Sequence, residues 1–266
     1  SIETKKPTGG FRYNISVEDN HNYSTITSLV GNCHLSPADT FSRVVNGINA
    51  KTKIGLSATP VRKDGLHVIL PDYFGPNRLI AIDDSKLSAS VEVVKTDIPF
   101  RIINPNRDWS RQLNVLAKNT KYLDLIAQIA NDKIAHGRCT LILSERIEML
   151  EELKTRIPGS VLLVGATKNT NREDILANAG NKYSAILSTR IFDEGISCHR
   201  LDTLILTCPG NNYAKLEQRI GRILRQHPDK KDPLIIDFWL ASPIIYRQQQ
   251  NRLEWYRKQN YEILNS

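Results

Sequence analysis

Short apolar runs rich in β-branched residues alternate with longer stretches of helical periodicity from residue 33 to residue 239. Near-continuous apolar runs are typical of strands that are buried on both faces, and their alternation with helices indicates an open parallel α/β sheet. The pattern therefore predicts an α/β protein. The predicted strands cover 53–59, 139–145, 160–167, 183–190, 202–207 and 233–239, and the predicted helices cover 113–135, 147–156, 171–179 and 213–226.

Composition limits the class of partner. The 266 residues include 36 Lys and Arg against 28 Asp and Glu, a net charge of +8, which favours a polyanionic partner such as nucleic acid. No run approaches the roughly 18 apolar residues that would span a bilayer, so we expect no membrane partner and a cytoplasmic protein, in the host cytoplasm if it is viral. The spacing of the four cysteines matches no metal site, and reduced thiols are expected.

Three segments depart from the main pattern. Residues 71–105 contain several prolines and a less regular strand, and we interpret them as the crossing between two domains. Residues 242–266 are predicted to form one long helix. Residues 1–32 are polar, and their alternation suits short antiparallel strands outside the α/β pattern. The absence of an initiator Met indicates that the sequence is a piece of a longer protein.

The run EQRIGRILRQH, Glu217 to His227, carries the strongest chemical signal. On a helix Arg222 and Arg225 lie three residues apart and share a face, while Gly221 lets the backbone approach a neighbour. Two guanidinium groups on one face suit a phosphoryl-transfer site, because planar cations stabilise charge on phosphate oxygens. The alternative is an ordinary solvated basic face.

Two further motifs follow predicted strands. GLSATP (Gly55–Pro60) ends one strand in small hydroxyl residues, and LSTRIFDEGIS (Leu187–Ser197) follows another with a turn that contains glycine. Ligands of doubly wound sheets bind outside the carboxyl ends of the strands. Both motifs therefore stand where a binding site is expected.

Taken in order, these motifs resemble those of the superfamily 2 DExH helicases, with the phage-type repair and recombination helicases as the nearest branch. Ser57 to Thr59 resembles motif III, LILSER (Leu141–Arg146) motif IV, Leu187–Ser197 motif V and Gln218–Arg225 motif VI. The resemblance covers residues 33–239. It implies two RecA-like parallel-sheet domains, ATP in the cleft between them and a nucleic-acid strand that crosses both.

The resemblance also implies roles for the residues around ATP. Arg222 and Arg225 would be the arginine fingers, and Gln218 would lie beside the nucleotide. Glu194 and Gly195 would form the motif V turn near the ribose and Mg²⁺. The cofactors of the completed enzyme would be ATP and Mg²⁺.

Other residues would couple ATP hydrolysis to the nucleic acid. Ser57, Ala58 and Thr59 would couple hydrolysis to domain closure. Ser144 and Thr189 would hydrogen-bond strand phosphates, which are contacts that position a strand without reading its sequence.

The chain lacks the other half of an ATP site. It contains no G-x-x-x-x-G-K-[ST] phosphate loop, no Asp-Glu pair precedes Cys33, and no metal ligand set is evident. The isolated chain is therefore predicted not to hydrolyse ATP, since the phosphate-binding amides, the loop lysine and the Mg²⁺-binding Asp are missing.

The segment YNISVEDNHNYSTITSLVGNC resembles the C-terminal splicing blocks of an intein, a β segment of the Hint type. The Asn32 side-chain amide can attack its own carbonyl and release Cys33, with His21 as general acid or base and the Cys33 thiolate as the acyl acceptor. Splicing would rebuild motif II as Asp-Glu-Cys33-His34, with His34 contacting motif III and the γ-phosphate water. The alternative is a plain β-hairpin leading into a domain.

The sequence therefore predicts three parts: an intein C-terminal segment (1–32), the end of RecA-like domain 1 (33–90) and RecA-like domain 2 (91–266). The predicted function is the C-terminal half of an ATP-dependent DNA helicase or translocase, joined by protein splicing to an N-terminal intein-helicase half. DNA is the expected strand, and RNA is not excluded. The alternative is a free-standing nucleic-acid-binding RecA-like module without splicing or ATPase activity.

Overall fold

The computed structural model describes residues 22–24, 28–32, 42–43, 46–47, 52–56, 65–77, 87–102, 105–189, 198–210 and 212–264. Contacts divide the chain into two compact units, Ser1–Ile82 and Asp83–Ser266. We call them the N-terminal unit and the C-terminal unit and describe each by itself.

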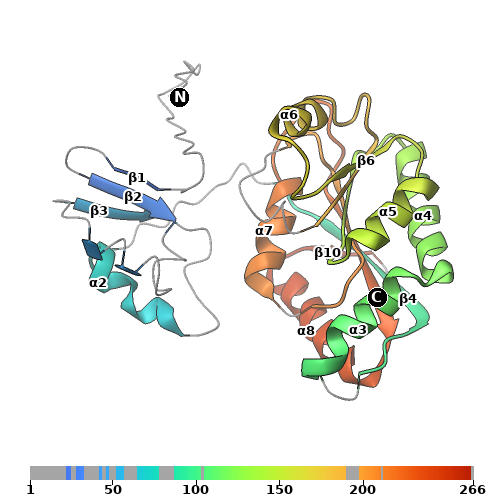
Figure 1. Ribbon diagram of the computed structural model, residues 1–266, viewed down its shortest axis with the longest axis horizontal. Helices are drawn as coiled ribbons and strands as arrows, with labels where there is room; N and C mark the ends of the chain where they lie inside the picture. The colour runs from blue at the N-terminus through green and yellow to red at the C-terminus, as the bar shows by residue number, and fades with distance from the viewer. Residues whose placement is uncertain are drawn as a thin grey trace. The chain divides into compact units, whose positions relative to one another are not determined.

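The N-terminal unit contains a three-stranded sheet in the order β1-β2-β3 (Figure 1). Strands β1 (Asn22–Ser24) and β2 (Ser28–Asn32) are antiparallel, as the alternation predicts. Strand β3 (Thr52–Leu56) lies parallel to β2, with Asn32 opposite Leu56. The segment set apart on sequence grounds thus shares a sheet with the first strand of the α/β pattern. A 3-10 helix η2 (Leu66–Ile69) and helix α2 (Leu70–Phe74) follow β3 in the chain.

The C-terminal unit is built on a seven-stranded sheet in the order β10-β4-β9-β8-β5-β7-β6. Every pair of neighbouring strands in this sheet is parallel, which confirms the predicted parallel α/β fold. All residues of β5, β7 and β8 are buried, as expected for strands covered on both faces. The strands are β4 (Ser90–Pro99), β5 (Thr140–Leu143), β6 (Ser160–Leu163), β7 (Ala185–Ser188), β8 (Thr203–Leu206), β9 (Leu234–Ala241) and β10 (Glu262–Ile263).

Helices cover both faces of this sheet and bury one hydrophobic core on each side (Figure 1). Strand residues alternate between the cores: Ile142 of β5 faces α3, α4 and α5, whereas Leu141 faces α6, α7 and α8. The result is a three-layer arrangement. The helices are α3 (Pro105–Ala117), α4 (Thr120–Ala135), α5 (Ile147–Arg156), α6 (Asn169–Ala177), α7 (Tyr213–Ile223) and α8 (Pro243–Lys258).

The single helix predicted over 113–135 is wrong, because α3 and α4 are separate helices. The chain breaks after Ala117 and restarts at Asn119, whose backbone is extended (φ −77°, ψ 103°) and whose side chain accepts a hydrogen bond from the Tyr122 N–H. An Asn side chain in this position satisfies one of the donors at a helix start. Continuous apolar periodicity concealed the break.

The long helix predicted over 242–266 is also shorter than expected. Helix α8 ends at Lys258, and Asn260 adopts a left-handed backbone conformation (φ 56°) that reverses the chain. Residues Glu262 and Ile263 then pair with Ser90 and Val91 as strand β10. The C-terminal segment therefore extends the sheet instead of continuing the helix.

The boundary between the two units, after Ile82, lies within the 71–105 segment interpreted as a domain crossing, but strand β4 shows that the segment from Ser90 on belongs to the C-terminal unit. It lies between β10 and β9 in the sheet, pairs with β9 over Ser90–Lys95, and buries Val91 completely. Strand β4 is thus an integral part of the C-terminal unit. The prolines at positions 99 and 105 stand at its end and at the start of α3, where they do not interrupt a ladder.

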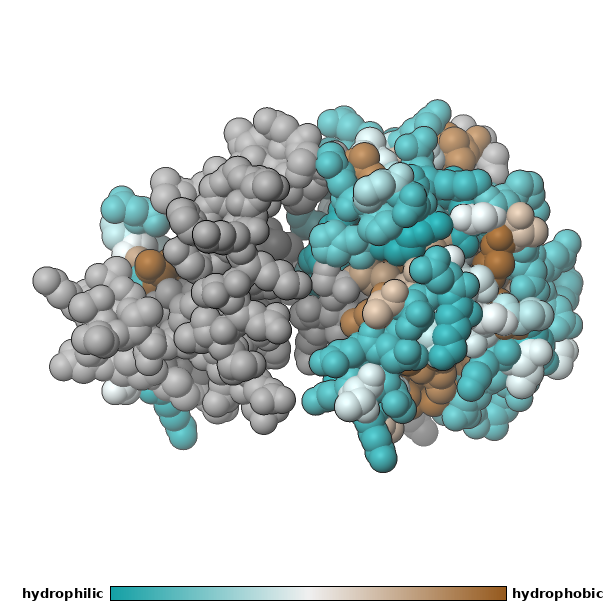
Figure 2. All heavy atoms as spheres, turned by 90° about the horizontal axis from the view of Figure 1, so that it is seen from above, coloured by the Kyte–Doolittle hydropathy of each residue, from teal (hydrophilic) through white to brown (hydrophobic). Residues whose placement is uncertain are grey.

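On the face of the C-terminal unit presented in Figure 2, hydrophobic residues form scattered groups among hydrophilic ones. The large exposed hydrophobic residues of this unit come from separate helices and the C-terminal segment. Among the residues that the structure describes, no helix combines the length and apolarity required to cross a membrane.

Candidate functional site

Ser144 and Thr189 lie at one edge of the sheet, which we call the carboxyl edge because β5, β7 and β8 end there. Leu143, the last residue of β5, is opposite Ser188, the last residue of β7. Ser144 and Thr189 follow these two residues and line the same small cavity, together with Thr207, Cys208 and Arg219. The structure thus brings together the two residues predicted to contact strand phosphates.

The Ser144 hydroxyl is engaged within the unit. Its side chain donates a hydrogen bond to Met149 Sδ at 3.3 Å and accepts one from the Arg146 N–H at 3.1 Å. Ser144 is 4% exposed, whereas Thr189 is half-buried. Ser144 therefore fixes the turn from β5 into α5, and Thr189 is the more accessible hydroxyl of the pair.

Arg146 attaches the same turn to α3. Its Nε donates to Asn114 Oδ1 at 2.6 Å, and its Nη2 donates to Ser110 Oγ at 2.6 Å. The hydrogen bonds of Ser144 and Arg146 thus hold the turn at the carboxyl edge in a fixed position against α3 and α5. Preorganisation of this kind favours a site whose donors keep their positions when a ligand arrives.

Helix α7 begins at a capped end and packs along one stripe. The Asn212 side chain accepts a hydrogen bond from the Lys215 N–H at 3.2 Å, which satisfies a donor of the first turn. Leu216, Ile220 and Ile223, spaced four and three residues apart, are buried in the core. These contacts fix the rotation of the helix about its axis.

Each residue of the buried stripe is followed, two positions later, by a polar residue. These polar residues are Gln218, Arg222 and Arg225. Two residues correspond to about 200° of rotation on a helix, so Gln218 and Arg222 lie on the side away from the core. All three residues are half-buried. Helix α7 ends at Ile223, three residues before the predicted end, so Arg225 projects from the chain just beyond the helix.

Arg219 received no role from the sequence, although it belongs to the same motif. It lines the cavity that contains Ser144 and Thr189, and it also lines a larger cavity of about 350 Å³, which we call the α7 cavity. Lys215 brings a further positive charge to that cavity and Glu145 a negative one, and Trp109 forms part of its wall. Arg252 also lines it, with its charge paired to the buried Asp237 at 2.8 Å. Helical spacing alone could have indicated this position, because Arg219 lies about 100° around the helix from Gln218, toward the strand ends.

Several predicted site residues lie outside the described residues. They are His21, Cys33, His34, Ser57, Ala58, Thr59, Glu194 and Gly195. Asn32 is described through its backbone as the last residue of β2. Their predicted roles in splicing, coupling and nucleotide binding stay predictions.

Comparison with known proteins agrees with the geometry of the carboxyl edge and α7. Residues 118–227, from the start of α4 to just beyond α7, match the helicase conserved C-terminal domain. The C-terminal unit contains a helicase C-terminal domain. The residues that resemble motif IV lie on β5 and the turn after it, and those that resemble motif VI lie on α7 and just beyond its end.

Two viral proteins illustrate the relationship of this helicase domain to longer helicases. The chain is 30% identical over 245 residues to the "Probable helicase D10" of Escherichia phage T5, covering 90% of this chain and 54% of that protein. It is 26% identical over 252 residues to the "Putative ATP-dependent RNA helicase L396" of Acanthamoeba polyphaga mimivirus, covering 88% and 47%. The chain thus spans about half the length of these relatives.

A solved structure shows the same fold. The S. cerevisiae protein Dbp5, bound to RNA and ADP BeF3, superposes with a TM-score of 0.62 at 12% identity, covering 90% of this chain and 59% of that one. At this identity the likeness supports the RecA-like α/β fold of the helicase C-terminal domain and no finer detail.

Proposed function

We propose that the chain is the C-terminal half of an ATP-dependent DNA helicase or translocase. The observation that carries this proposal is the arrangement of α7, where a buried apolar stripe holds Gln218 and Arg222 on the opposite side and Arg225 follows just beyond the helix end. The match of residues 118–227 to the helicase C-terminal domain supports it.

Arg222 and Arg225 suit the phosphates of ATP. Guanidinium groups make paired, charge-assisted hydrogen bonds to phosphate oxygens and stabilise the charge that develops there during phosphoryl transfer. The half-buried Gln218 lies one helical turn before Arg222 and can bond the nucleotide beside them. When bound, ATP supplies the phosphoryl group and Mg²⁺ neutralises its oxygens. The Glu194–Gly195 turn is proposed to approach the ribose and Mg²⁺.

The carboxyl edge is proposed to hold the nucleic-acid strand. Thr189 and Arg219, which line one small cavity with Ser144, offer a hydroxyl and a cation to the strand backbone. Contacts of this kind bind phosphates without reading sequence. DNA is the proposed strand, and preference for RNA is an alternative outcome of a binding measurement.

The chain supplies only one side of this ATP site. The phosphate loop and the Asp-Glu of motif II are absent from its sequence, so an N-terminal half has to provide them. His34 and the Ser57-Ala58-Thr59 segment are proposed to link the two halves, through the γ-phosphate water and through domain closure.

Protein splicing is the proposed route by which the halves are joined. The Cys33 thiolate attacks the acyl group that the upstream chain holds as a thioester on the intein's N-terminal cysteine. A thioester to Cys33 forms, and the thiolate of that cysteine leaves. The Asn32 side-chain nitrogen then attacks its own carbonyl carbon, forms a succinimide and breaks the bond to the Cys33 nitrogen, with His21 transferring the proton. The freed Cys33 amine finally attacks the thioester, which leaves a normal peptide bond.

Co-expression tests the splicing step. The partner is an upstream reading frame that ends in Asp-Glu followed by an intein N-terminal segment. We expect mass spectrometry to detect a ligated chain that begins its C-terminal portion at Cys33 and lacks residues 1–32. Asn32→Ala should abolish ligation, while the exposed control Asn171→Ala on α6 should ligate normally. Ligation that persists in Asn32→Ala would contradict the cyclisation role.

ATP turnover tests the helicase assignment in the completed enzyme. We expect Arg222→Ala and Arg225→Ala each to lower kcat by about 10³-fold or more, since an arginine finger contributes on this scale. Affinity for a non-hydrolysable ATP analogue should change little. Arg257→Ala, an exposed arginine on α8, is the matched control. Unchanged turnover in both finger variants would refute the assignment.

The alternative is a free-standing nucleic-acid-binding module. The C-terminal unit has its own sheet and two cores, and cationic residues line the α7 cavity. Such a module would bind nucleic acid unaided, with an affinity that falls steeply with salt. Strong binding by the isolated chain, without ligation on co-expression, would favour it.

A further inference from the structure

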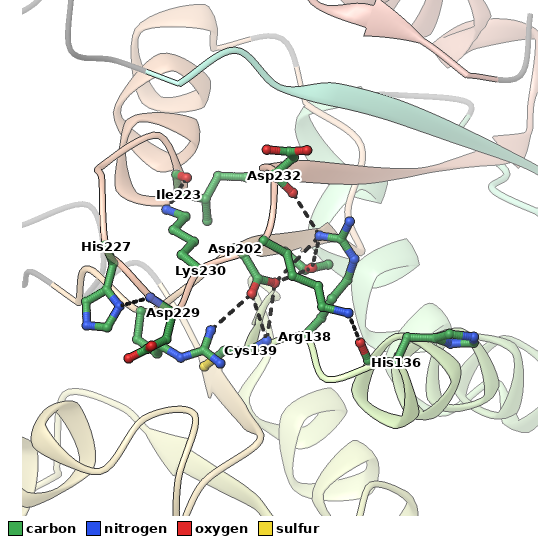
Figure 3. Close-up of polar contacts among 12 residues, drawn as sticks. His136, Arg138, Cys139, Asp202, Ile223, His227, Asp229, Lys230 and Asp232 are labelled. Atoms are coloured by element: carbon green, nitrogen blue, oxygen red, sulfur yellow. Dashed lines mark hydrogen bonds and ion pairs between the residues drawn. The ribbon is translucent and has the colours of Figure 1, made fainter.

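Two successive lysines in the loop after α7 bind the ends of two different helices. The Lys230 ammonium donates a hydrogen bond to the carbonyl of Ile223 (Figure 3) and another to that of Arg225 at 2.7 Å. Lys231 donates to the carbonyl of His136 at the end of α4. Helix α7 packs in one core and α4 in the other. The loop therefore reaches across the edge of the sheet to both helical layers.

The end of α7 carries carbonyls that no helical N–H can reach. The last four carbonyls of any α-helix lack a partner within the helix. Here Lys230 bonds the Ile223 carbonyl and also that of Arg225 just beyond the helix, and the backbone N–H of Leu87 bonds the carbonyl of the C-cap residue Leu224 at 3.1 Å. Three successive carbonyls thus have a donor, two of them from one side chain. The positive charge of Lys230 also complements the negative end of the helix dipole.

Lys230 occupies a half-buried position that the loop itself makes rigid. The Lys230 N–H donates to the carbonyl of His227 at 3.2 Å, and the Asp229 N–H donates to His227 Nδ1 at 3.2 Å (Figure 3). The carboxylate of Asp202 helps to hold the ammonium charge against its burial and the nearby Arg200. Because the loop is already ordered, little further conformational entropy is lost when the Lys230 side chain binds the helix end.

The buried Asp202 connects the surroundings of Lys230 to the sheet. Its carboxylate accepts hydrogen bonds from the Cys139 N–H at 3.2 Å, the Thr203 hydroxyl at 2.8 Å and Arg200 Nη1 at 3.3 Å (Figure 3). These bonds tie the amino ends of β5 and β8 together. The carboxylate that attracts the Lys230 ammonium is therefore held in place by the buried sheet.

We propose that Lys230 is a positioning residue for the arginine fingers. By binding the carbonyls of Ile223 and Arg225, it fixes the backbone between Arg222 and Arg225, where the helix ends. It holds the two guanidinium groups at a constant separation although only Arg222 lies within α7. This proposal rests on the proposed role of the two arginines in ATP hydrolysis.

Hydrogen exchange on the 266-residue chain tests the geometry independently of any activity. We expect Lys230→Met to increase exchange of the amides at 220–225 by about 10-fold or more, because a net hydrogen bond contributes about 1 kcal/mol and two are lost. Lys230→Arg should restore much of the protection. The matched control Lys231→Met should loosen the end of α4 and leave α7 unchanged. Equal exchange at 220–225 in wild type and Lys230→Met would overturn the proposal.

Steady-state kinetics of the completed enzyme test the consequence for catalysis. We expect Lys230→Met to lower kcat by about 10- to 100-fold with KM for ATP within about twofold, since small displacements of a catalytic group have effects of this size. Lys230→Arg should recover most of the loss, and Lys231→Met should retain wild-type kcat. An unchanged kcat in Lys230→Met would overturn the positioning role. A wild-type enzyme without ATPase activity would instead refute the proposed function, and the exchange measurement would still decide whether Lys230 fixes the helix end.

Discussion

The guanidinium of Arg252 on α8 lies 2.8 Å from the carboxylate of Asp237 on β9, with side chains that are 4% and 0% exposed. The Tyr256 hydroxyl donates to the other carboxylate oxygen at 3.1 Å. The pair joins the last long helix to a central strand of the C-terminal unit. Because both charges are removed from water, each depends on the other for compensation.

Removal of one member of this pair should destabilise the unit strongly. We expect Arg252→Met to lower the free energy of unfolding by about 3–5 kcal/mol, because it leaves the Asp237 charge buried without its partner. Urea denaturation of the chain measures the change. The double variant Arg252→Met/Asp237→Leu should recover most of the loss, and the exposed Arg257→Met is the control. A single variant as stable as wild type would contradict this account.

Tyr122 should support the end of β8 through its hydroxyl. The buried Tyr122 OH donates to the Thr207 carbonyl at 2.7 Å, just before the loop that leads to α7. Tyr122→Phe leaves that carbonyl without this donor, and we expect a loss of about 1–2 kcal/mol in unfolding free energy. Tyr246→Phe changes a tyrosine that is 57% exposed and should be neutral. Equal losses in the two variants would argue against the bond.

Lys230 should give the chain a characteristic pH dependence. Burial, with smaller effects of Arg200 and Arg225, lowers the pKa of Lys230 from 10.5 to about 8, against the opposing attraction of Asp202 and Cys198. Between pH 8 and 10.5 the unfolded chain therefore holds more protons at this residue than the folded chain does, and stability rises with pH. The unfolding free energy of wild type minus that of Lys230→Met should increase across this window in urea titrations. A decrease would show that the pKa is not lowered.

The cysteines of the C-terminal unit should resist alkylation. Burial raises the pKa of Cys139 to about 12 and also raises the pKa of the Cys198 and Cys208 thiols. In a Cys33→Ser variant only these three thiols are left. We expect maleimide at pH 7.5 to label Cys139 more than about 100-fold more slowly than in urea-unfolded protein, as judged by peptide mass mapping. Labelling of Cys139 at the unfolded rate would place that thiol at the surface.

Local apolar patterning was sufficient to predict the sheet but not its edges. Strands β5 and β8 both have the sequence Thr-Leu-Ile-Leu, and three consecutive apolar residues indicate burial on both faces of the sheet. Strand β4 alternates between buried and partly exposed residues and includes Glu92 and Lys95, so it resembles an irregular segment until β9 and β10 pair with it. Pairings of such long sequence separation leave no local signal.

Part of the candidate site could likewise be predicted from the sequence, and part depends on the folded structure. The face of α7 that carries Gln218 and Arg222 follows from helical spacing, and Leu216, Ile220 and Ile223 set its direction. Lys230 lies outside the motif, and its function depends on a loop that returns to the helix end. The position of Arg219 in two cavities depends on where β5, β7 and β8 end in space. Sequence spacing expresses none of these relationships.

Strands β2 and β3 pair in the N-terminal unit, so the proposed splicing would remove the strand that pairs with β3 as well as change covalent bonds. Strand β2 ends at Asn32 and lies along β3 from Ser28 opposite Thr52 to Asn32 opposite Leu56. If residues 1–32 are excised as proposed, β3 loses this ladder, and its backbone donors and acceptors require another strand or water. The upstream strand that arrives with the Asp-Glu pair would be attached directly to Cys33, at the position that β2 leaves. On this proposal β2 would cover one edge of β3 only until splicing removes residues 1–32.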